Sequence, residues 1–156
     1  MDEIIVHCSA SKEGKEVSSD SIDQLHKARK FSSYVSGGKT HYIGYHFLIH
    51  LDGTIEECRP IAKMGCHASG HNARSIGICY IGGLDSKEAI KDTRTSEQKE
   101  ALVKLIKELK NRRPTIKRVM GHRDTSPDLN GNGVIEPFEW IKGCPCFDAI
   151  KEYKDI

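Results

Sequence analysis

Short runs of apolar, β-branched residues constrain the fold of this chain more than any other feature. They occur at Glu3–Cys8, at Ser75–Ile81, which Gly82-Gly83 follows, and at Ile116–Met120. Runs of this length that are rich in Ile and Val are typical of buried strands. None of them approaches the roughly 20 apolar residues of a membrane span, so we expect no membrane partner. Other elements must cover the apolar faces of the sheet that these strands would form.

A hairpin and two helices are also expected. Gly44–His50 and Thr54–Cys58 flank Asp52-Gly53, a hairpin turn signal, whereas Gly37-Gly38-Lys39 is read as a loop. Ser19-Asp20-Ser21 offers an N-cap for a short helix.

The second helix is predicted from a stronger pattern. Thr95-Ser96-Glu97-Gln98 offers a capping box, and apolar residues then follow one helical face as far as Pro114. Strands mixed with a hairpin and two helices predict an α/β fold with a central mixed sheet flanked by helices. The order of the strands cannot be read from the pattern.

Length and charge narrow the class of protein. The 156 residues suit one ordinary domain, and no linker or repeat marks a boundary, so we expect a single domain over residues 1–156. The formal net charge is only +2. A protein that binds nucleic acid by neutralising phosphates is usually far more basic, so no nucleic-acid partner is expected. The locally basic stretch from Lys104 to Arg118 is interpreted as a solvated helix face.

The N-terminus and the cysteines bear on the compartment. Met1-Asp2-Glu3 is acidic and the apolar run after it is short, so no secretory signal is predicted and the chain is expected to be cytoplasmic as synthesised. In that setting the six cysteines are expected to be free thiols or metal ligands rather than a disulfide framework. We expect a monomer.

Histidines suggest a metal site, but not at the most obvious pair. His46 and His50 have the spacing that joins two ligands on a helix, yet they stand among strand residues. In a strand they would be roughly 13 Å apart, too far to share an ion. His7, His122 and Cys144 are better candidates because they follow predicted strands or lie in an irregular segment. Two imidazoles and one thiolate suit zinc with an open fourth position, although composition alone favours structural roles for these residues.

Several motifs, in order along nearly the whole chain, resemble the zinc-dependent N-acetylmuramoyl-L-alanine amidases of the bacteriophage lysozyme type, related to peptidoglycan recognition proteins. The motifs are Ile5–Ser11, Gly44–Phe47, Asp52–Thr54, Gly65–Gly70, Asn72, Ser75–Ile78, Gly121–Asp124 and Lys142–Pro145. The resemblance implies a mixed sheet flanked by helices, a groove for peptidoglycan or muropeptides, and hydrolysis of the amide between the N-acetylmuramic acid lactyl group and L-alanine.

The resemblance also implies roles for individual residues. His7, His122 and Cys144 match the zinc ligands of the family. Tyr45 matches the tyrosine beside the metal and Lys142 a cationic catalytic residue. His67 matches a residue of the substrate groove.

One segment departs from the shorter phage enzymes, because His122 and Cys144 are farther apart here than in those enzymes. The segment at about 126–140 matches a calcium-loop pattern, which we interpret as an insertion holding a structural Ca²⁺ ion. Its expected ligands are Asp128, Asn130, Asn132, the carbonyl group of Val134, and Glu139. An Asn/Gly-rich turn without an ion remains the alternative.

Other functions stay open at this point. The chain could be a peptidoglycan-binding module without a metal, a calcium-responsive interaction protein, or a thiol hydrolase that uses Cys144. An amidase could serve phage or prophage lysis, reaching the cell wall through a lysis pore, or recycle muropeptides in the cytoplasm. The leading prediction is an endolysin-type zinc amidase.

Overall fold

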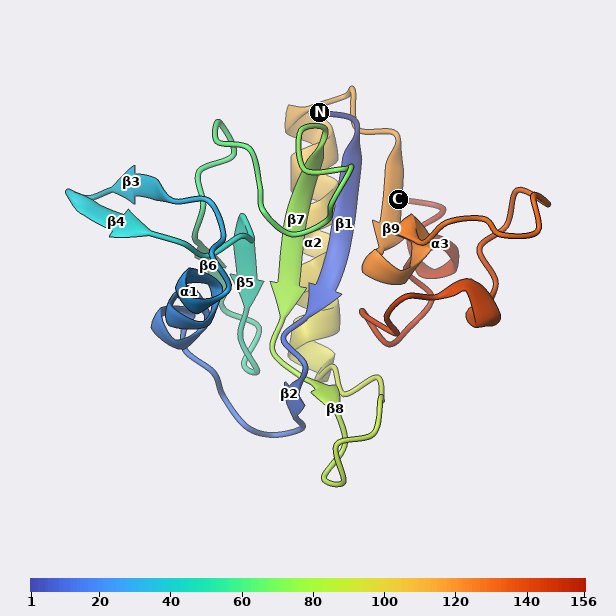
Figure 1. Ribbon diagram of the computed structural model, residues 1–156, viewed down its shortest axis with the longest axis horizontal. Coiled ribbons are helices and arrows are strands. Elements are labelled where there is room, and N and C mark those ends of the chain that lie inside the picture. Colours follow the sequence, from blue (N-terminus) through green and yellow to red (C-terminus); the bar gives the residue numbers. More distant parts are fainter.

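A five-stranded mixed sheet forms the centre of the computed structural model, which describes residues 1–156 (Figure 1). The strand order is β6-β5-β7-β1-β9. Strands β5, β7, β1 and β9 run parallel to one another, and only β6 is antiparallel to its neighbour. The predicted α/β fold with a mixed sheet is therefore confirmed. The strands are β1 (Glu3–Cys8), β5 (Phe47–Ile49), β6 (Ile55–Glu57), β7 (Ser75–Tyr80) and β9 (Arg118–Gly121).

The other elements surround this sheet. Two small two-stranded sheets pair β2 (Ser11–Lys12) with β8 (Gly83–Leu84) and β3 (Tyr34–Ser36) with β4 (Lys39–His41). The helices are α1 (Ser19–Ala28), α2 (Ser96–Arg112) and α3 (Ala149–Glu152). Two 3-10 turns, η1 (His122–Thr125) and η2 (Pro137–Glu139), follow β9. None of the helices combines the length and the apolar character needed to cross a bilayer.

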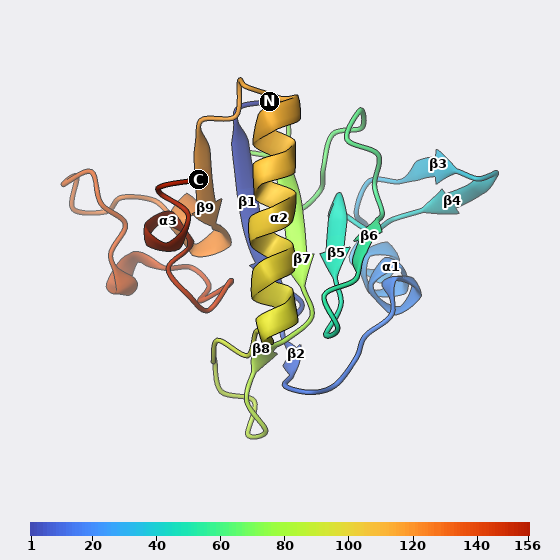
Figure 2. The ribbon, with the colours of Figure 1, turned by 180° about the vertical axis from the view of Figure 1, so that it is seen from behind.

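Helix α2 covers one face of the sheet and forms the main core with it (Figure 2). The predicted capping box is present, because the Thr95 hydroxyl accepts the N–H of Gln98 and the Gln98 side chain accepts the N–H of Thr95. Gln98 is buried and also donates to the carbonyl groups of Ile49 and Ile81. The cap thus joins the start of α2 to the ends of β5 and β7. The fully buried residues of this core include Ile4, Val6, Ile76, Ile78, Leu102 and Ile106.

The opposite face of the sheet carries a cavity rather than a long helix. Helix α1 lies toward one side of this face and the segment after β9 toward the other (Figure 1). A cavity of about 170 Å³ is lined by residues of β1, α1 and η1, and by Lys142 and Cys144. The ends of the parallel strands therefore open into a space that these flanking segments enclose.

Three local predictions need correction. The N-cap of α1 is Ser18, whose hydroxyl accepts the N–H of Ser21, rather than a residue of Ser19–Ser21. The expected loop at Gly37-Gly38 is the turn of the β3–β4 hairpin, and both glycines have positive φ (57° and 74°), which suits a two-residue turn. The last strand of the sheet begins at Arg118 rather than Ile116, and Ile116 packs into the core instead.

Shortening a buried side chain of α2 should measurably weaken the core. Leu102 is fully buried against the sheet, so Leu102→Ala is expected to lower the free energy of unfolding by about 3 kcal/mol. Urea unfolding followed by circular dichroism would measure the change. The exposed neighbour in Glu100→Ala serves as the control and should change stability by no more than about 0.5 kcal/mol. Equal effects from both variants would contradict this account of the core.

Candidate active site

His7 and His122 meet because β1 and β9 are parallel neighbours. The register pairs Val6 with Gly121, so the next residue on each strand lies at the same end of the sheet. The two imidazole ring centroids are 4.6 Å apart. His122 also begins η1, where its carbonyl group accepts the Thr125 hydroxyl. Residues far apart in the sequence are thus brought side by side by strand pairing.

Cys144 reaches the same place from the segment after η2. Its sulfur accepts the backbone N–H of Cys8 at 3.2 Å. Its carbonyl oxygen accepts the N–H of Arg123 at 2.7 Å, and the next carbonyl, that of Pro145, accepts the buried Tyr80 hydroxyl at 2.7 Å. The segment is therefore fastened to β1, η1 and β7. Ligand atoms of His7, His122 and Cys144 all lie within 4.8 Å of one another.

This donor set fits a zinc ion. A tetrahedral zinc ion holds nitrogen and sulfur donors roughly 3.3–3.8 Å apart, so only small adjustments would be needed. Burial, followed by the charges of His67, His122 and Lys142, lowers the pKa of His7 well below its ordinary value. Burial and the nearby charge of Lys142 lower the pKa of His122 to about 4. Both imidazoles are thus neutral near pH 7, which is the form that binds a metal.

His67 lies beside the three donors and contacts one of them directly. Its Nδ1 is 2.9 Å from Nε2 of His7, and its backbone N–H donates to the side chain of Asn72. Burial lowers the pKa of His67 to about 3. The imidazole packs over Gly77 of β7, where a Cβ would lie 2.6 Å from Cδ2 of His67. The contact with His7 was not expected from the sequence, although a glycine inside a strand signals close approach of this kind.

Tyr45 lines the cavity with its ring near the donors. Its ring centroid is 5.1 Å from that of His7. Burial, with smaller contributions from the thiols of Cys79, Cys144 and Cys8, raises the pKa of Tyr45 well above its ordinary value. The phenol therefore keeps its proton near pH 7 and can donate a hydrogen bond, but it is a poor general base.

Lys142 is exposed and lines the same cavity, where its positive charge lowers the pKa of both His7 and His122. The opposite wall comes from Leu25 and His26 of α1 and from Arg29, the residue after the helix, which were not predicted as site residues. His26 is buried, its Nδ1 accepts the N–H of Gly44, and its ring stacks on Phe31. These residues do not have the sequence spacing of metal ligands, so only the amphipathic pattern of α1 could have predicted that they line a cavity.

The family follows from comparison with known proteins. Residues 1–132 match the family model described as N-acetylmuramoyl-L-alanine amidase. The chain belongs to this family. The phage proteins it resembles include the endolysin of Enterobacteria phage K11, with 33% identity over 97% of this chain and 85% of that protein, and the endolysin of Klebsiella phage KP32, with 35% identity over 94% and 81%.

Solved structures agree with the fold of this amidase. N-acetylmuramoyl-L-alanine amidase LysC from Clostridium intestinale URNW superposes with a TM-score of 0.68 and 28% identity, covering 97% of this chain and 80% of that one. Bumblebee PGRP-SA shares the fold with a TM-score of 0.67 at 23% identity, over 99% and 80% of the two chains. The predicted resemblance to both groups of proteins is thereby confirmed.

His46 and His50, which were expected to lie too far apart to share an ion, flank β5 of the amidase at its two ends. His46 is fully buried, where Nδ1 accepts the N–H of Gly77 and the Nε2 atom is 3.1 Å from the carbonyl oxygen of Lys63. His50 lies between the carboxylates of Glu16 and Glu56, at 2.9 and 2.7 Å. Neither belongs to the His7, His122 and Cys144 group.

The predicted calcium loop is closed by its own hydrogen bonds. The Asp128 carboxylate accepts the N–H groups of Gly131 and Gly133. Glu139 is buried and accepts three backbone N–H groups, two with Oε1 and one with Oε2. The side-chain oxygens of Asn130 and Asn132 each accept an N–H group as well. These bonds account for the shape of the loop without an ion, and neither this geometry nor the relatives support calcium.

Acid should destabilise the metal-free amidase partly through His46. Burial lowers the pKa of His46 to about 4 from an ordinary value of 6.5. Between these values the unfolded chain binds a proton that the folded chain does not. The free energy of unfolding should therefore fall as pH decreases, by up to about 1.4 kcal/mol per pH unit from this residue. The contribution of His46 to the free energy of unfolding is fully present above pH 6.5.

The variant His46→Gln keeps a donor and an acceptor at this position but cannot bind a proton. Urea unfolding at several pH values should give a shallower loss of stability with acid for His46→Gln than for the unchanged chain, even if the variant is less stable throughout. Identical slopes would show that His46 is not the group that titrates.

Proposed function

We propose that this chain is a zinc-dependent, endolysin-type enzyme that hydrolyses the amide between the N-acetylmuramic acid lactyl group and L-alanine of peptidoglycan stem peptides. The observation that carries the proposal is the convergence of two neutral imidazoles and one thiol within 4.8 Å at the floor of an open cavity. Membership of the amidase family and the phage endolysins among its relatives support the same reaction.

In this proposal His7, His122 and Cys144 hold the ion and leave its fourth position open toward the cavity. When bound, zinc would supply a Lewis acid that lowers the pKa of a water molecule and polarises the amide carbonyl. The N–H of Cys8 donates to the sulfur of Cys144, which stabilises the thiolate form. The contact of His67 with Nε2 of His7 fixes the orientation of that imidazole ring.

Lys142 and Tyr45 would act on the substrate. The Lys142 ammonium lies over the cavity and can stabilise the oxyanion that forms when the amide carbonyl is attacked. The Tyr45 phenol retains its proton, so its role is to orient the attacking water by donating or accepting a hydrogen bond. His67 lines the same cavity and would contact the substrate beside the ion.

A binding module without catalysis is the second candidate. The peptidoglycan recognition proteins share the fold at identities that say nothing of activity. The complete donor set and the ammonium of Lys142 in the same cavity favour catalysis. Action on soluble muropeptides instead of the cell wall would use the same residues. We further propose that the amidase domain comprises residues 1–156, that the segment at about 126–140 is an insertion, and that the chain acts as a monomer.

Metal removal tests the reaction. Dialysis against a chelator is expected to abolish release of stem peptides from purified peptidoglycan, and adding Zn²⁺ should restore it. The chain as purified should contain about one zinc ion, and Cys144→Ser should lose most of it. Release that survives chelation but stops after thiol alkylation would instead favour a thiol hydrolase.

Substituting the two proposed catalytic residues should separate chemistry from metal binding. Lys142→Met is expected to lower kcat by about 100- to 1000-fold, because the oxyanion loses its cation, and Lys142→Arg should recover part of the rate. Tyr45→Phe should cost about 10- to 100-fold. Zinc content, measured by mass spectrometry, should stay unchanged in all three variants. Loss of zinc would assign these residues to metal binding or folding instead.

We also propose a structural calcium ion in the loop, with Asp128, Asn130, Asn132, Val134 and Glu139 as its ligands. If the loop binds Ca²⁺, adding it to metal-stripped protein should raise the melting temperature, and Asp128→Asn should remove the rise. An unchanged melting temperature would leave the Asn/Gly-rich turn, closed by its backbone hydrogen bonds, as the full account of the segment.

A further inference from the structure

An open cavity of about 870 Å³ lies at the β9 edge of the sheet, between β9, α3 and the segment that carries η1 and η2 (Figure 1). Its lining comes from Arg118 and Met120 of β9, from residues 123–140 and from residues 148–154. We call it the β9 cavity. It shares no lining residue with the cavity at His7, His122 and Cys144, so it has no part in the proposed amide hydrolysis.

Two side chains that line the β9 cavity carry buried N–H donors without a partner. In the whole chain, three buried side-chain nitrogen or oxygen atoms have no hydrogen-bond partner, and two of them are Nε of Arg123 and Nε1 of Trp140. Guanidinium and indole N–H groups can only donate. Buried donors without an acceptor are rare in folded proteins, and a bound water or ion often accounts for them. The missing partner at this place is therefore an acceptor.

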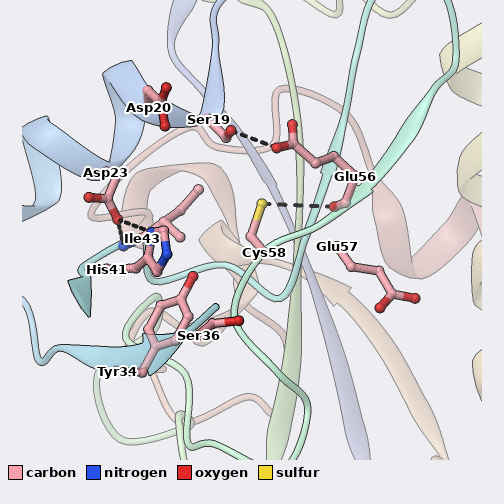
Figure 3. A pocket seen from close by; sticks show the side chains of 10 residues that line it. All are labelled: Ser19, Asp20, Asp23, Tyr34, Ser36, His41, Ile43, Glu56, Glu57 and Cys58. Carbon is pink, nitrogen blue, oxygen red and sulfur yellow. Dashed lines mark hydrogen bonds and ion pairs between the residues drawn. The ribbon is translucent and has the colours of Figure 1, made fainter. Parts of the chain in front are cut away.

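A cavity between α1, the β3–β4 hairpin and β6 differs in this respect (Figure 3). It has a volume of about 240 Å³ and is lined by four carboxylates. Asp23 accepts two backbone N–H groups, Glu56 accepts the Ser19 hydroxyl, and Asp20 and Glu57 are exposed. The protein and the solvent thus satisfy its carboxylates, and none of its buried side-chain atoms lacks a partner.

The Arg123 guanidinium is held by stacking rather than by hydrogen bonds. Its Cζ atom lies 4.0 Å from the centre of the Trp140 ring, and the Arg123 side chain keeps 12% of its surface exposed. The Asp124 carboxylate is 3.9 Å from Nε, beyond hydrogen-bond distance, and it accepts the N–H of Gly121 instead. A guanidinium stacked on an aromatic ring presents its remaining N–H groups as a fixed fork, which matches the oxygens of a carboxylate or a phosphate.

The charge of the β9 cavity favours a phosphate group over a carboxylate. Four basic side chains and two carboxylates line it, namely Arg118, Arg123, Lys151 and Lys154 with Asp124 and Asp148. Both carboxylates accept a backbone N–H group, and Arg118 pairs with Glu3. Arg123 and the exposed Lys151 and Lys154 are left for a ligand. A phosphate carries more negative charge than a carboxylate and has more oxygens, so it can engage donors that stand apart.

We propose that the β9 cavity binds a phosphate group. A phosphate oxygen that enters beside the stacked pair would accept from Arg123 and Trp140, and the two lysines would add charge at the rim. Apolar side chains surround this place. Five of the nine large apolar side chains that the chain exposes belong to residues 129–150, namely Leu129, Val134, Phe138, Ile141 and Ile150. Basic groups next to exposed apolar side chains suit the boundary between lipid head groups and acyl chains.

Two sources share this chemistry, the head group of an anionic lipid and a soluble phosphate ester. Trp140 is the only tryptophan of the chain, so its fluorescence reports on the β9 cavity. The zinc-loaded full chain would be titrated with glycerol 3-phosphate, with glycerate, and with vesicles of phosphatidylcholine with and without phosphatidylglycerol. A saturable fluorescence change with glycerol 3-phosphate or with the anionic vesicles supports the site, and the tighter probe identifies the source. Glycerate should bind at least about tenfold more weakly than glycerol 3-phosphate.

Variants locate the binding, because a zinc ion at the metal site can also take up phosphate. Lys151→Gln with Lys154→Gln should weaken binding at least about tenfold, and Arg123→Lys, which keeps the charge but loses the fork, about fivefold. Lys99→Gln with Lys107→Gln removes the same charge from exposed positions of α2 and should leave the affinity unchanged.

Absence of binding by both phosphate probes would overturn the proposal. Equal affinities for all variants, or an equal loss in the α2 pair, would overturn it as well, because the binding would then lie at the metal site or follow net charge alone. Release of stem peptides by the Lys151→Gln and Lys154→Gln chain should stay unchanged, so failure of this proposal leaves the proposed amide hydrolysis intact.

Discussion

The parallel pairing of β1 with β9 is the interaction on which the active site depends. Its register sets Val6 opposite Gly121, and the histidine after each of them leaves the sheet at the same edge. A shift of the register by one residue would turn one imidazole toward the opposite face of the sheet. The core beneath α2 holds this register, because alternate residues of β1 are fully buried there. The meeting of the two imidazoles is therefore a consequence of packing on the other side of the same strand.

The third donor is held differently. Cys144 belongs to no strand or helix and owes its place to separate hydrogen bonds with Cys8, Arg123 and, through the next residue, Tyr80. Such bonds are individually modest but together fix an irregular segment against two strands. His7 and His122 are thus placed by strand pairing, whereas Cys144 is placed by hydrogen bonds from neighbouring segments.

The sequence predicted the strands of the central sheet and the capped helix α2, because periodicity and caps are local signals. Strand order and register are not local, so the proximity of His7 and His122 rested on a family resemblance until the pairing was known. The contact between His67 and His7 depends on Gly77, whose missing side chain makes room in a neighbouring strand. The sequence did not predict the cavity that Tyr34 lines. A loop was expected at Gly37-Gly38, whereas the structure has a hairpin there.

Helix α1 separates two cavities of different character, and each uses its own set of helical positions. Residues that lie on different sides of a helix can change with little mutual interference. Substitutions at Asp20 or Asp23 would change one cavity, and substitutions at Leu25 or His26 would change the wall of the cavity at His7 and His122.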